Sequence, residues 1–146
     1  MKFPKKKWLG QPSKKENLEA TLDKWFSKYI RLRDSDKNGI CCCITCLRIF
    51  HWKEGDAGHF ISRDRSATRY DERNVNAQCV PCNRFKSGLQ YEHGLAIDKK
   101  YGPGTAQMLN ILSKVHSKLN DFYYKRQIEI YKKKVKEMSN KLLIFN

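Results

Sequence analysis

Four of the six cysteines form two Cys-x-x-Cys pairs, Cys43 with Cys46 and Cys79 with Cys82. A two-residue spacer lets both sulfur atoms of a pair face one ion. Two such pairs complete a tetrahedral thiolate shell around Zn²⁺, with Zn–S distances of about 2.3 Å. Because four cysteines leave no coordination position open, the sequence predicts a structural rather than a catalytic zinc ion. Clustered cysteines in a reducing compartment favour metal binding over disulfides.

Two further cysteines, Cys41 and Cys42, leave the register of the first pair open. Cys42 and Cys46 would form a looser pair with three residues between them. Cys43 and Cys46 repeat the spacing of the downstream pair. We therefore expect these two to be the ligands and Cys41 to be the spare thiol.

Residue types suited to phosphodiester hydrolysis lie between the two pairs and just after them. Neutral imidazole titrates near pH ~6.5, so His59 can take the proton of an attacking water as a general base. Asn83 follows the last cysteine directly and, with Asp56, can supply the oxygen ligands that Mg²⁺ or Mn²⁺ takes. Asp56 could instead orient the loop. Asn74 completes the predicted catalytic set, where we expect it to tie the loop together or to align His59.

The other histidines are weaker candidates. His51, with Glu54 nearby, is the substitute if His59 is not the base. His93 and His116 have no partners close to them in the sequence, so we expect both to be packing or surface residues.

These motifs form a joint pattern over about residues 25–105. Its parts are Tyr29–Asp34, the Cys43 pair, Asp56–Phe60, Asn74 and Gln78–Gly88. The pattern resembles the phage NinG/Rap recombination endonucleases, which are HNH-like ββα-metal nucleases. It is more distantly similar to endonuclease VII, in which an Asn follows the last zinc cysteine. The string Asp56–His59 is also similar to the Asp-Arg-Gly-His signature of sugar-nonspecific nucleases.

The resemblance implies an α+β fold, with a zinc-stabilised ββα-metal (HNH-like) nuclease core flanked by N-terminal and C-terminal helices. It also implies a Mg²⁺-dependent, structure-selective DNA endonuclease that cuts branched recombination intermediates such as Holliday junctions and D-loops. One departure is Gly58, because many HNH enzymes have a metal-binding Asp or His directly before the base. The role of Asp56, as metal ligand or structural residue, therefore stays open.

Composition and turn residues divide the chain into four segments. These are a basic arm over 1–12, a helix over 13–34, the nuclease core over 35–92 and a basic helical region over 93–146. Ser13 and Glu16 predict a capping box at the start of the first helix. In the core, short strands are expected at Leu47–Trp52 and His59–Ile61, and Asn83 is expected at the start of a short helix.

The C-terminal region is predicted to be helical, with a break at 102–104. Thr105 is expected to cap a helix that runs to Leu119. Beyond it, apolar residues recur at alternating spacings of four and three, which is typical of a coiled-coil seam. They are Tyr124, Ile128, Tyr131, Val135, Met138 and Leu142. The seam is expected either to pack on the N-terminal helix or to form a homodimer.

A strong excess of basic residues indicates a polyanionic partner. The chain has 30 Lys and Arg against 15 Asp and Glu, a formal net charge of +15. Basic side chains displace the counterions condensed on DNA phosphates, so DNA is the expected partner. The residues expected to contact it are Arg63, Arg65, Arg69, Arg84, Lys86, Lys132 and Lys133.

No membrane association is expected. No stretch reaches the ~18–20 apolar residues of a membrane span, and no apolar run follows the basic N-terminus, as a signal peptide would require. We expect a cytoplasmic location, which is the host cytoplasm if the chain is phage-encoded.

A second class of function is a non-catalytic, zinc-stabilised module that binds DNA or RNA. Such a module needs neither a general base nor ligands for a catalytic metal. The joint presence of His59, Asn74 and Asn83 therefore favours the endonuclease.

Overall fold

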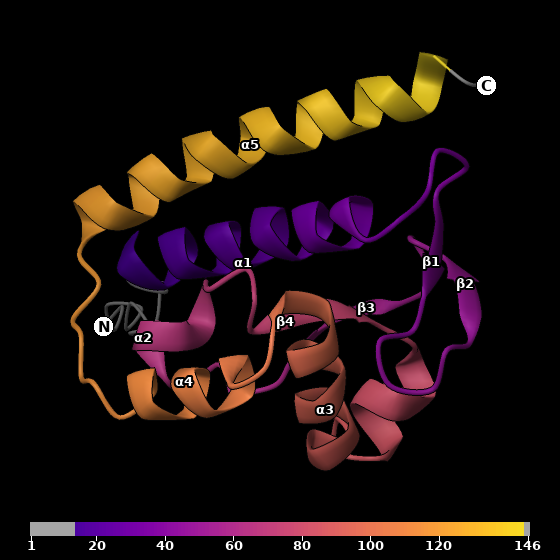
Figure 1. The fold of residues 1–146 in the computed structure, drawn as a ribbon. Helices are drawn as coiled ribbons and strands as arrows, with labels where there is room; N and C mark the ends of the chain where they lie inside the picture. The colour runs from indigo at the N-terminus through magenta and orange to yellow at the C-terminus, as the bar shows by residue number, and fades with distance from the viewer. Residues whose placement is uncertain (1–13, 145–146) are drawn as a thin grey trace, which may run out of the picture.

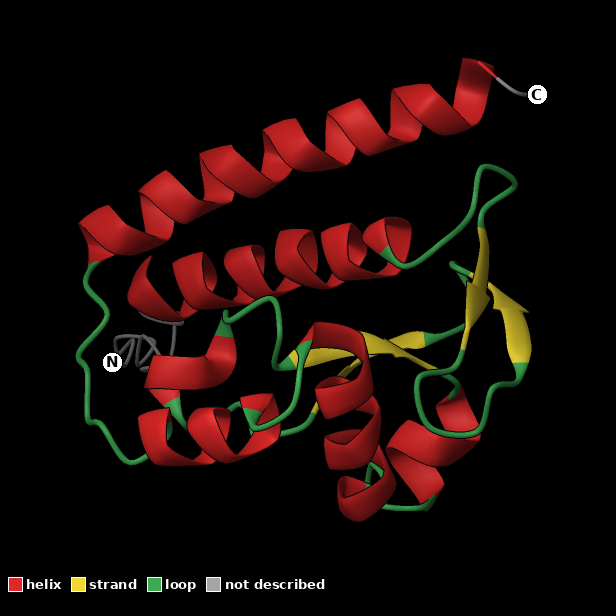
Figure 2. Cartoon of the chain, viewed as in Figure 1, coloured by secondary structure: helices red, strands yellow, loops and turns green. Residues whose placement is uncertain are grey.

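The two longest helices, α1 (Lys14–Arg33) and α5 (Asp121–Ile144), lie side by side along one side of the molecule and run in the same direction (Figure 1). The computed structural model describes residues 14–144. Two small sheets and the shorter helices lie on the other side of α1 from α5 (Figure 2). The α+β class that the sequence predicts is confirmed. Ser13, predicted to cap α1, lies outside the described residues.

The apolar seam of α5 packs on α1 and forms the main core. The rings of Phe26 and Tyr131 meet edge to face, with centroids 5.0 Å apart. The buried residues of this core are Leu22, Phe26, Tyr29, Ile30, Leu32, Tyr70, Val75, Tyr124, Ile128, Tyr131 and Val135. Of the two alternatives for the seam, packing on the N-terminal helix is the one observed. A homodimer through the same residues would require α5 to leave α1.

Two antiparallel hairpins carry the residues of chemical interest. They pair β1 (Ile40–Cys42) with β2 (Ile49–His51), and β3 (Asp56–His59) with β4 (Val75–Gln78). Cys43 and Cys46 lie in the loop of the first hairpin, whereas Cys79 follows the second. A short π-helix, η1 (Pro81–Phe85), comes directly after β4 and contains Cys82.

The strands differ in part from the predicted ones. The strand expected at Leu47–Trp52 is confirmed in shorter form as β2. The strand expected at His59–Ile61 is wrong, because β3 ends at His59 instead of beginning there. The sequence did not predict β1 or β4. All four residues of β4 are buried, including Asn76 and Gln78, so the strand lacks the alternation of polar and apolar residues that marks a half-buried strand.

Three shorter helices complete the fold, and their limits correct two predictions. They are α2 (Ser66–Arg69), α3 (Gln90–Tyr101) and α4 (Thr105–Leu112). The helix predicted to run to Leu119 thus ends at Leu112. Thr105 does not cap α4, because its hydroxyl donates to the Gly102 carbonyl (2.7 Å). Asp98 of α3 instead accepts a hydrogen bond from the Ala106 amide (2.8 Å), which satisfies an otherwise unpaired N–H of the first turn.

Among residues 14–144, no helix combines the length and the apolar character that crossing a membrane requires.

The core between α1 and α5 gives a first testable prediction. Phe26 is only 2% exposed and touches Tyr70 as well as Tyr131, so Phe26→Ala leaves a cavity and is expected to lower the free energy of unfolding by about 3–5 kcal/mol. Phe122→Ala is the matched control, because Phe122 is 72% exposed. Urea denaturation of both variants checks this, and equal stability losses would contradict the assignment of the core.

Candidate functional site

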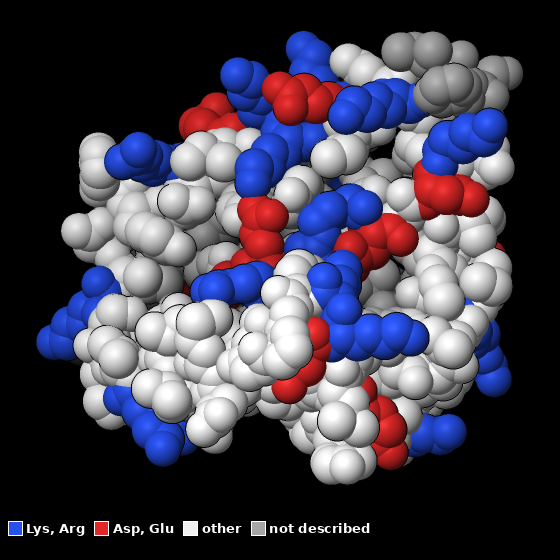
Figure 3. All heavy atoms as spheres, in the orientation of Figure 1, with Lys and Arg blue, Asp and Glu red and all other residues white. Residues whose placement is uncertain are grey.

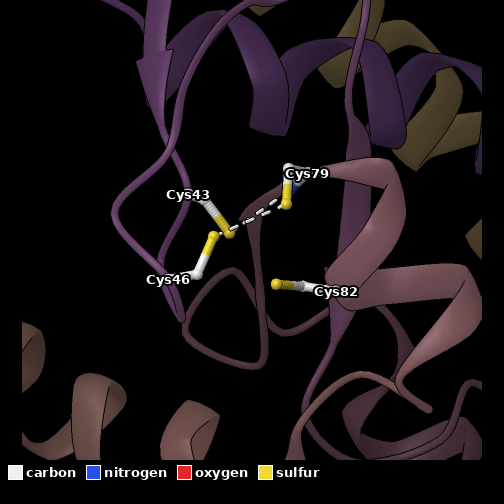
Figure 4. Close-up of side chains that lie close together, drawn as sticks. All are labelled: Cys43, Cys46, Cys79 and Cys82. Atoms are coloured by element: carbon white, nitrogen blue, oxygen red, sulfur yellow. Dashed lines mark hydrogen bonds between the residues drawn. The ribbon is translucent and has the colours of Figure 1, made fainter.

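Four sulfur atoms converge between the two hairpins. The Sγ atoms of Cys43, Cys46, Cys79 and Cys82 all lie within 4.8 Å of one another, and their side chains point toward a common centre (Figure 4). A tetrahedral shell with Zn–S distances of about 2.3 Å places its sulfur atoms about 3.8 Å apart. The observed separation of 3.6 Å between Cys46 Sγ and Cys79 Sγ agrees with that value. The four cysteines therefore fit a zinc ion.

The backbone around Cys43 is shaped to hold thiolate charge. The amide of Leu47 donates to the Cys43 carbonyl (3.0 Å), and Leu47 adopts φ of 62°, which closes a tight turn. The amide of Cys79 donates to Cys43 Sγ at 3.3 Å, and the Thr45 hydroxyl lies 3.3 Å from the same sulfur. Burial raises the pKa of the Cys43 thiol, but amide and hydroxyl donors outweigh it and lower the pKa to about 6. Metal binding requires this deprotonated form.

Cys41 and Cys42 lie outside the cluster of four sulfur atoms. Cys41 is buried, and its thiol donates to the Arg31 carbonyl at 3.2 Å. Burial and the nearby Asp34 carboxylate raise the pKa of Cys41 to about 12, so this thiol stays protonated. Cys42 is exposed and faces the Leu47 carbonyl. The cluster instead includes Cys43 and Cys46, the pair expected from the sequence.

His59, at the end of β3, is held in one orientation. Its Nε2 lies 3.0 Å from the Arg69 carbonyl oxygen. A carbonyl only accepts, so Nε2 carries the proton and Nδ1 is the basic nitrogen. Burial lowers the pKa of His59 below its ordinary value, so the ring is neutral at physiological pH.

Asp56, at the other end of β3, is bound to η1 through Asn83 and Arg84. Its carboxylate accepts two hydrogen bonds from Arg84, each of 2.7 Å, and one of 2.9 Å from Asn83 Nδ2. The Arg84 hydrogen bonds hold the pKa of Asp56 below its ordinary value despite partial burial. Asp56 thus orients both neighbours, which agrees with the structural alternative for this residue, and Asn83 is left with its amide oxygen as a further acceptor.

Position 58, directly before His59, has no room for a side chain. A Cβ atom at Gly58 would lie 2.2 Å from Gln78 Oε1 and 3.0 Å from Gln78 Cβ. Gln78 is fully buried and tied to the Gly88 carbonyl (2.8 Å), so it has little room to move. An Asp or His directly before His59 is therefore excluded.

These residues meet in two clefts. One, of about 360 Å³, is lined by Asp56, His59, Arg63 and Asn83, and also by Asp23 of α1. The second, of about 380 Å³, shares His59, Arg63 and Asn83 and is also lined by Ser87, Gly88 and Gln90. The structure thus brings a neutral imidazole, two oxygen-bearing side chains and an exposed arginine together in one cleft.

Asn74 does not line either cleft. It is fully buried, and its amide oxygen accepts from the Ile61 amide (2.7 Å). Its Nδ2 donates to the carbonyls of Ile61 and Thr68, both at 3.0 Å. Asn74 therefore ties together the loop between β3 and α2, as one of its two expected roles had it. All of these hydrogen bonds lie outside the two clefts that His59 lines.

Arg69 was predicted to contact DNA but has another partner. Its guanidinium pairs with Asp23 (2.6 Å) and Glu19 (3.3 Å) of α1, while its carbonyl holds His59. The side chain therefore anchors α2 to α1. We did not predict from the sequence that Asp23 would take part in the site. The signal it offers there is an acidic side chain among the apolar positions of α1.

The other expected DNA-binding residues are better placed. Arg63, Arg65, Lys86 and Lys133 are exposed. Lys132 is exposed as well and pairs with Glu129 (2.9 Å). On the face shown in Figure 3, many basic side chains lie beside acidic ones, so the net charge is not concentrated there.

The remaining histidines agree with their expected roles. His93 is buried and packs edge-on against Phe60, with ring centroids 5.8 Å apart, and His116 is exposed. His51, the substitute base, lies in β2 and lines neither cleft.

A comparison with known protein families identifies the family of this chain. The family model described as "Bacteriophage Lambda NinG protein" matches residues 4–141. The chain belongs to the NinG family. No solved structure matches it.

The NinG relatives come from several phages and share about a third of the matched residues. The "Protein ninG" of Salmonella phage P22 is 31% identical over 102 residues, which is 68% of this chain and 42% of that protein. The proteins of the same name from Escherichia phage 933W and Escherichia phage lambda are 35% and 34% identical over 88 residues, covering 58% of this chain and 35% of each relative. The chain thus spans less than half the length of these relatives.

The cysteine cluster gives the second prediction. Cys82→Ser is expected to lose bound zinc and to lower the free energy of unfolding by more than about 3 kcal/mol, because structural zinc in small modules contributes about 10–16 kcal/mol. Cys42→Ser is the matched control, since Cys42 is exposed and outside the cluster. Elemental analysis and thermal unfolding measure both effects, and full zinc content in Cys82→Ser would refute the ligand set.

The Arg84–Asp56 pair gives the third prediction. Arg84→Ala is expected to raise the pKa of Asp56, because the hydrogen bonds that favour the carboxylate are lost. In the folded protein the pKa of Asp56 is lower than its value of about 3.9 in the unfolded chain. The ionised carboxylate therefore stabilises the folded state above pH ~3.9, and this stabilisation is lost as the pH falls through the folded pKa. NMR titration of the Asp56 carboxyl carbon measures this pKa in wild type and in Arg84→Ala. Arg65→Ala, at an exposed arginine in the loop before α2, should leave the titration of Asp56 unchanged.

Proposed function

We propose that this NinG-family chain is a divalent-metal-dependent DNA endonuclease with an HNH-like core formed by β3, β4 and η1. The observation that carries the proposal is the position of His59. Its ring is fixed through Nε2 and neutral, and it shares a cleft with Asp56 and Asn83. A general base beside oxygen ligands is the arrangement that phosphodiester hydrolysis requires.

The proposed reaction starts at His59. Nδ1 takes a proton from a water molecule as its oxygen attacks phosphorus, and the opposite P–O bond of the phosphodiester breaks. The departing alkoxide then receives a proton from solvent. Because Nε2 donates to the Arg69 carbonyl, the ring is held in one orientation and Nδ1 is the nitrogen left to accept the proton.

The oxygens of Asp56 and Asn83 are the proposed ligands of Mg²⁺ or Mn²⁺. Such an ion supplies positive charge for the phosphate and for the leaving oxygen. The residues fit a hard cation, since both can present oxygen to the same cleft and such ions need few protein ligands. Arg84 donates to both carboxylate oxygens of Asp56, so it must release at least one of them before Asp56 can bind a cation. Its side chain is 61% exposed and can turn toward a substrate phosphate.

The proposed substrate is DNA, and specifically branched recombination intermediates such as Holliday junctions. The net charge of +15 and the exposed Arg63, Arg65 and Lys86 near the cleft support a nucleic-acid substrate. The selection of branched DNA rests on the resemblance of the sequence motifs to recombination endonucleases.

The fourth prediction tests the activity. Wild type is expected to nick a labelled four-way junction when Mg²⁺ or Mn²⁺ is present, and His59→Ala to cut about 10²–10⁴-fold more slowly, as for loss of a general base. Because burial lowers the pKa of His59, cleavage should persist below pH ~6.5 and fall only as the ring becomes protonated at lower pH.

His116→Ala is the control, since His116 is exposed and outside the clefts. Zinc content and far-UV circular dichroism of each variant separate lost chemistry from lost folding. If zinc-loaded wild type bound the junction but cut it with neither Mg²⁺ nor Mn²⁺, the endonuclease proposal would fail. The chain would then act as a non-catalytic zinc module that binds nucleic acid.

A further inference from the structure

An aromatic side chain stands in solvent beside the candidate active site. Phe85 is 80% exposed, the highest value among the large hydrophobic residues that the structure leaves open. It lies two residues after Asn83, between the exposed Arg84 and Lys86. A basic–aromatic–basic sequence at the edge of a cleft is the composition of single-stranded nucleic-acid binding surfaces.

The backbone holds Phe85 on a rigid support. The Lys86 amide donates to the Pro81 carbonyl (3.1 Å), and the Gly88 amide donates to the Cys82 carbonyl (2.9 Å). Both bonds fasten the end of η1 to the turn that carries the last cysteine ligand. The residues that follow, Ser87 and Gly88, line the cleft of His59. The exposure of Phe85 is therefore a fixed feature of the site.

We propose that Phe85 stacks on an exposed base face next to the phosphate to be cut, while Arg84 and Lys86 contact the neighbouring backbone. This proposal rests on the proposed endonuclease function and deepens it. Every base has an aromatic face, so stacking on Phe needs no particular sequence. The flanking cations match the phosphates of such a strand and do not suit an apolar protein partner.

Stacking on Phe85 would explain physically why the protein prefers branched DNA to a continuous duplex. In a continuous duplex both faces of each base are covered by neighbouring base pairs. At a branch point the stack is interrupted, so a base face can meet the Phe85 ring without the cost of unstacking. The specificity would then come from an open base face, while Arg84 and Lys86 bind any strand.

The fifth prediction concerns binding without cleavage. Zinc-loaded protein is mixed, with no added divalent metal, with a four-way junction that carries 2-aminopurine at the branch, or with a linear duplex of matched sequence. Phe85→Ala is expected to weaken junction binding about 5–150-fold, the range expected for loss of one stacked base, and duplex binding less than about 2-fold. Phe85→Trp should retain tight junction binding and quench the 2-aminopurine fluorescence.

Phe122→Ala is the matched control, because Phe122 is also exposed but lies on α5. Unchanged zinc content shows that Phe85→Ala is folded. Equal losses on junction and duplex would overturn the proposal in favour of a wedge that opens any duplex. Unchanged junction binding would overturn it as well. Because the readout needs no catalytic metal, a protein that binds in this way but never cuts would refute the endonuclease and leave the stacking site standing.

Discussion

The four-cysteine cluster is the constraint on which the rest of the site depends. The buried core around it consists of Cys41, Cys43, Phe50, Ala77, Cys79 and Cys82, so cysteines of the cluster make up half of this core. A core of this size buries little surface, and metal binding then supplies much of the free energy of folding. Since Asn83 adjoins Cys82, the same cluster fixes where the candidate metal ligand stands relative to β3.

Helix α1 is the second support, and it acts through polar contacts as well as through its apolar face. Asp34, just past its end, accepts a hydrogen bond from the Ala77 amide (2.8 Å) in β4. Arg33 donates to the carbonyls of Glu72 and Val75, and Asp23 holds Arg69. Because the Arg69 carbonyl orients His59, the long helix pair and the imidazole form one connected structure.

The electrostatics of the cleft follow from paired charges. Asp23 and Asp56, its two acidic residues, each bind an arginine, so neither is a free anion that would repel a phosphate. Burial keeps the His59 imidazole neutral, and the lowered pKa makes the ring a weaker base that stays unprotonated to lower pH. This arrangement suits a polyanionic substrate, because Arg63, which lines the cleft outside these two pairs, is positive.

The sequence by itself determined the features that depend on neighbours along the chain. Three features are local and could be read from the sequence: the spacing of Cys43 with Cys46 and of Cys79 with Cys82, the position of Asn83 directly after Cys82, and the apolar seam of α5. Tertiary structure decided the rest: the partner of the α5 seam, the pairing of Arg69 with Asp23, and the grip of Arg84 on Asp56. These contacts join residues that are far apart in sequence, and nothing in the spacing of charged residues says which opposite charge the fold will bring near. The polar strand β4 escaped prediction for the same reason, because buried Asn and Gln are stabilised by hydrogen bonds that exist only after folding.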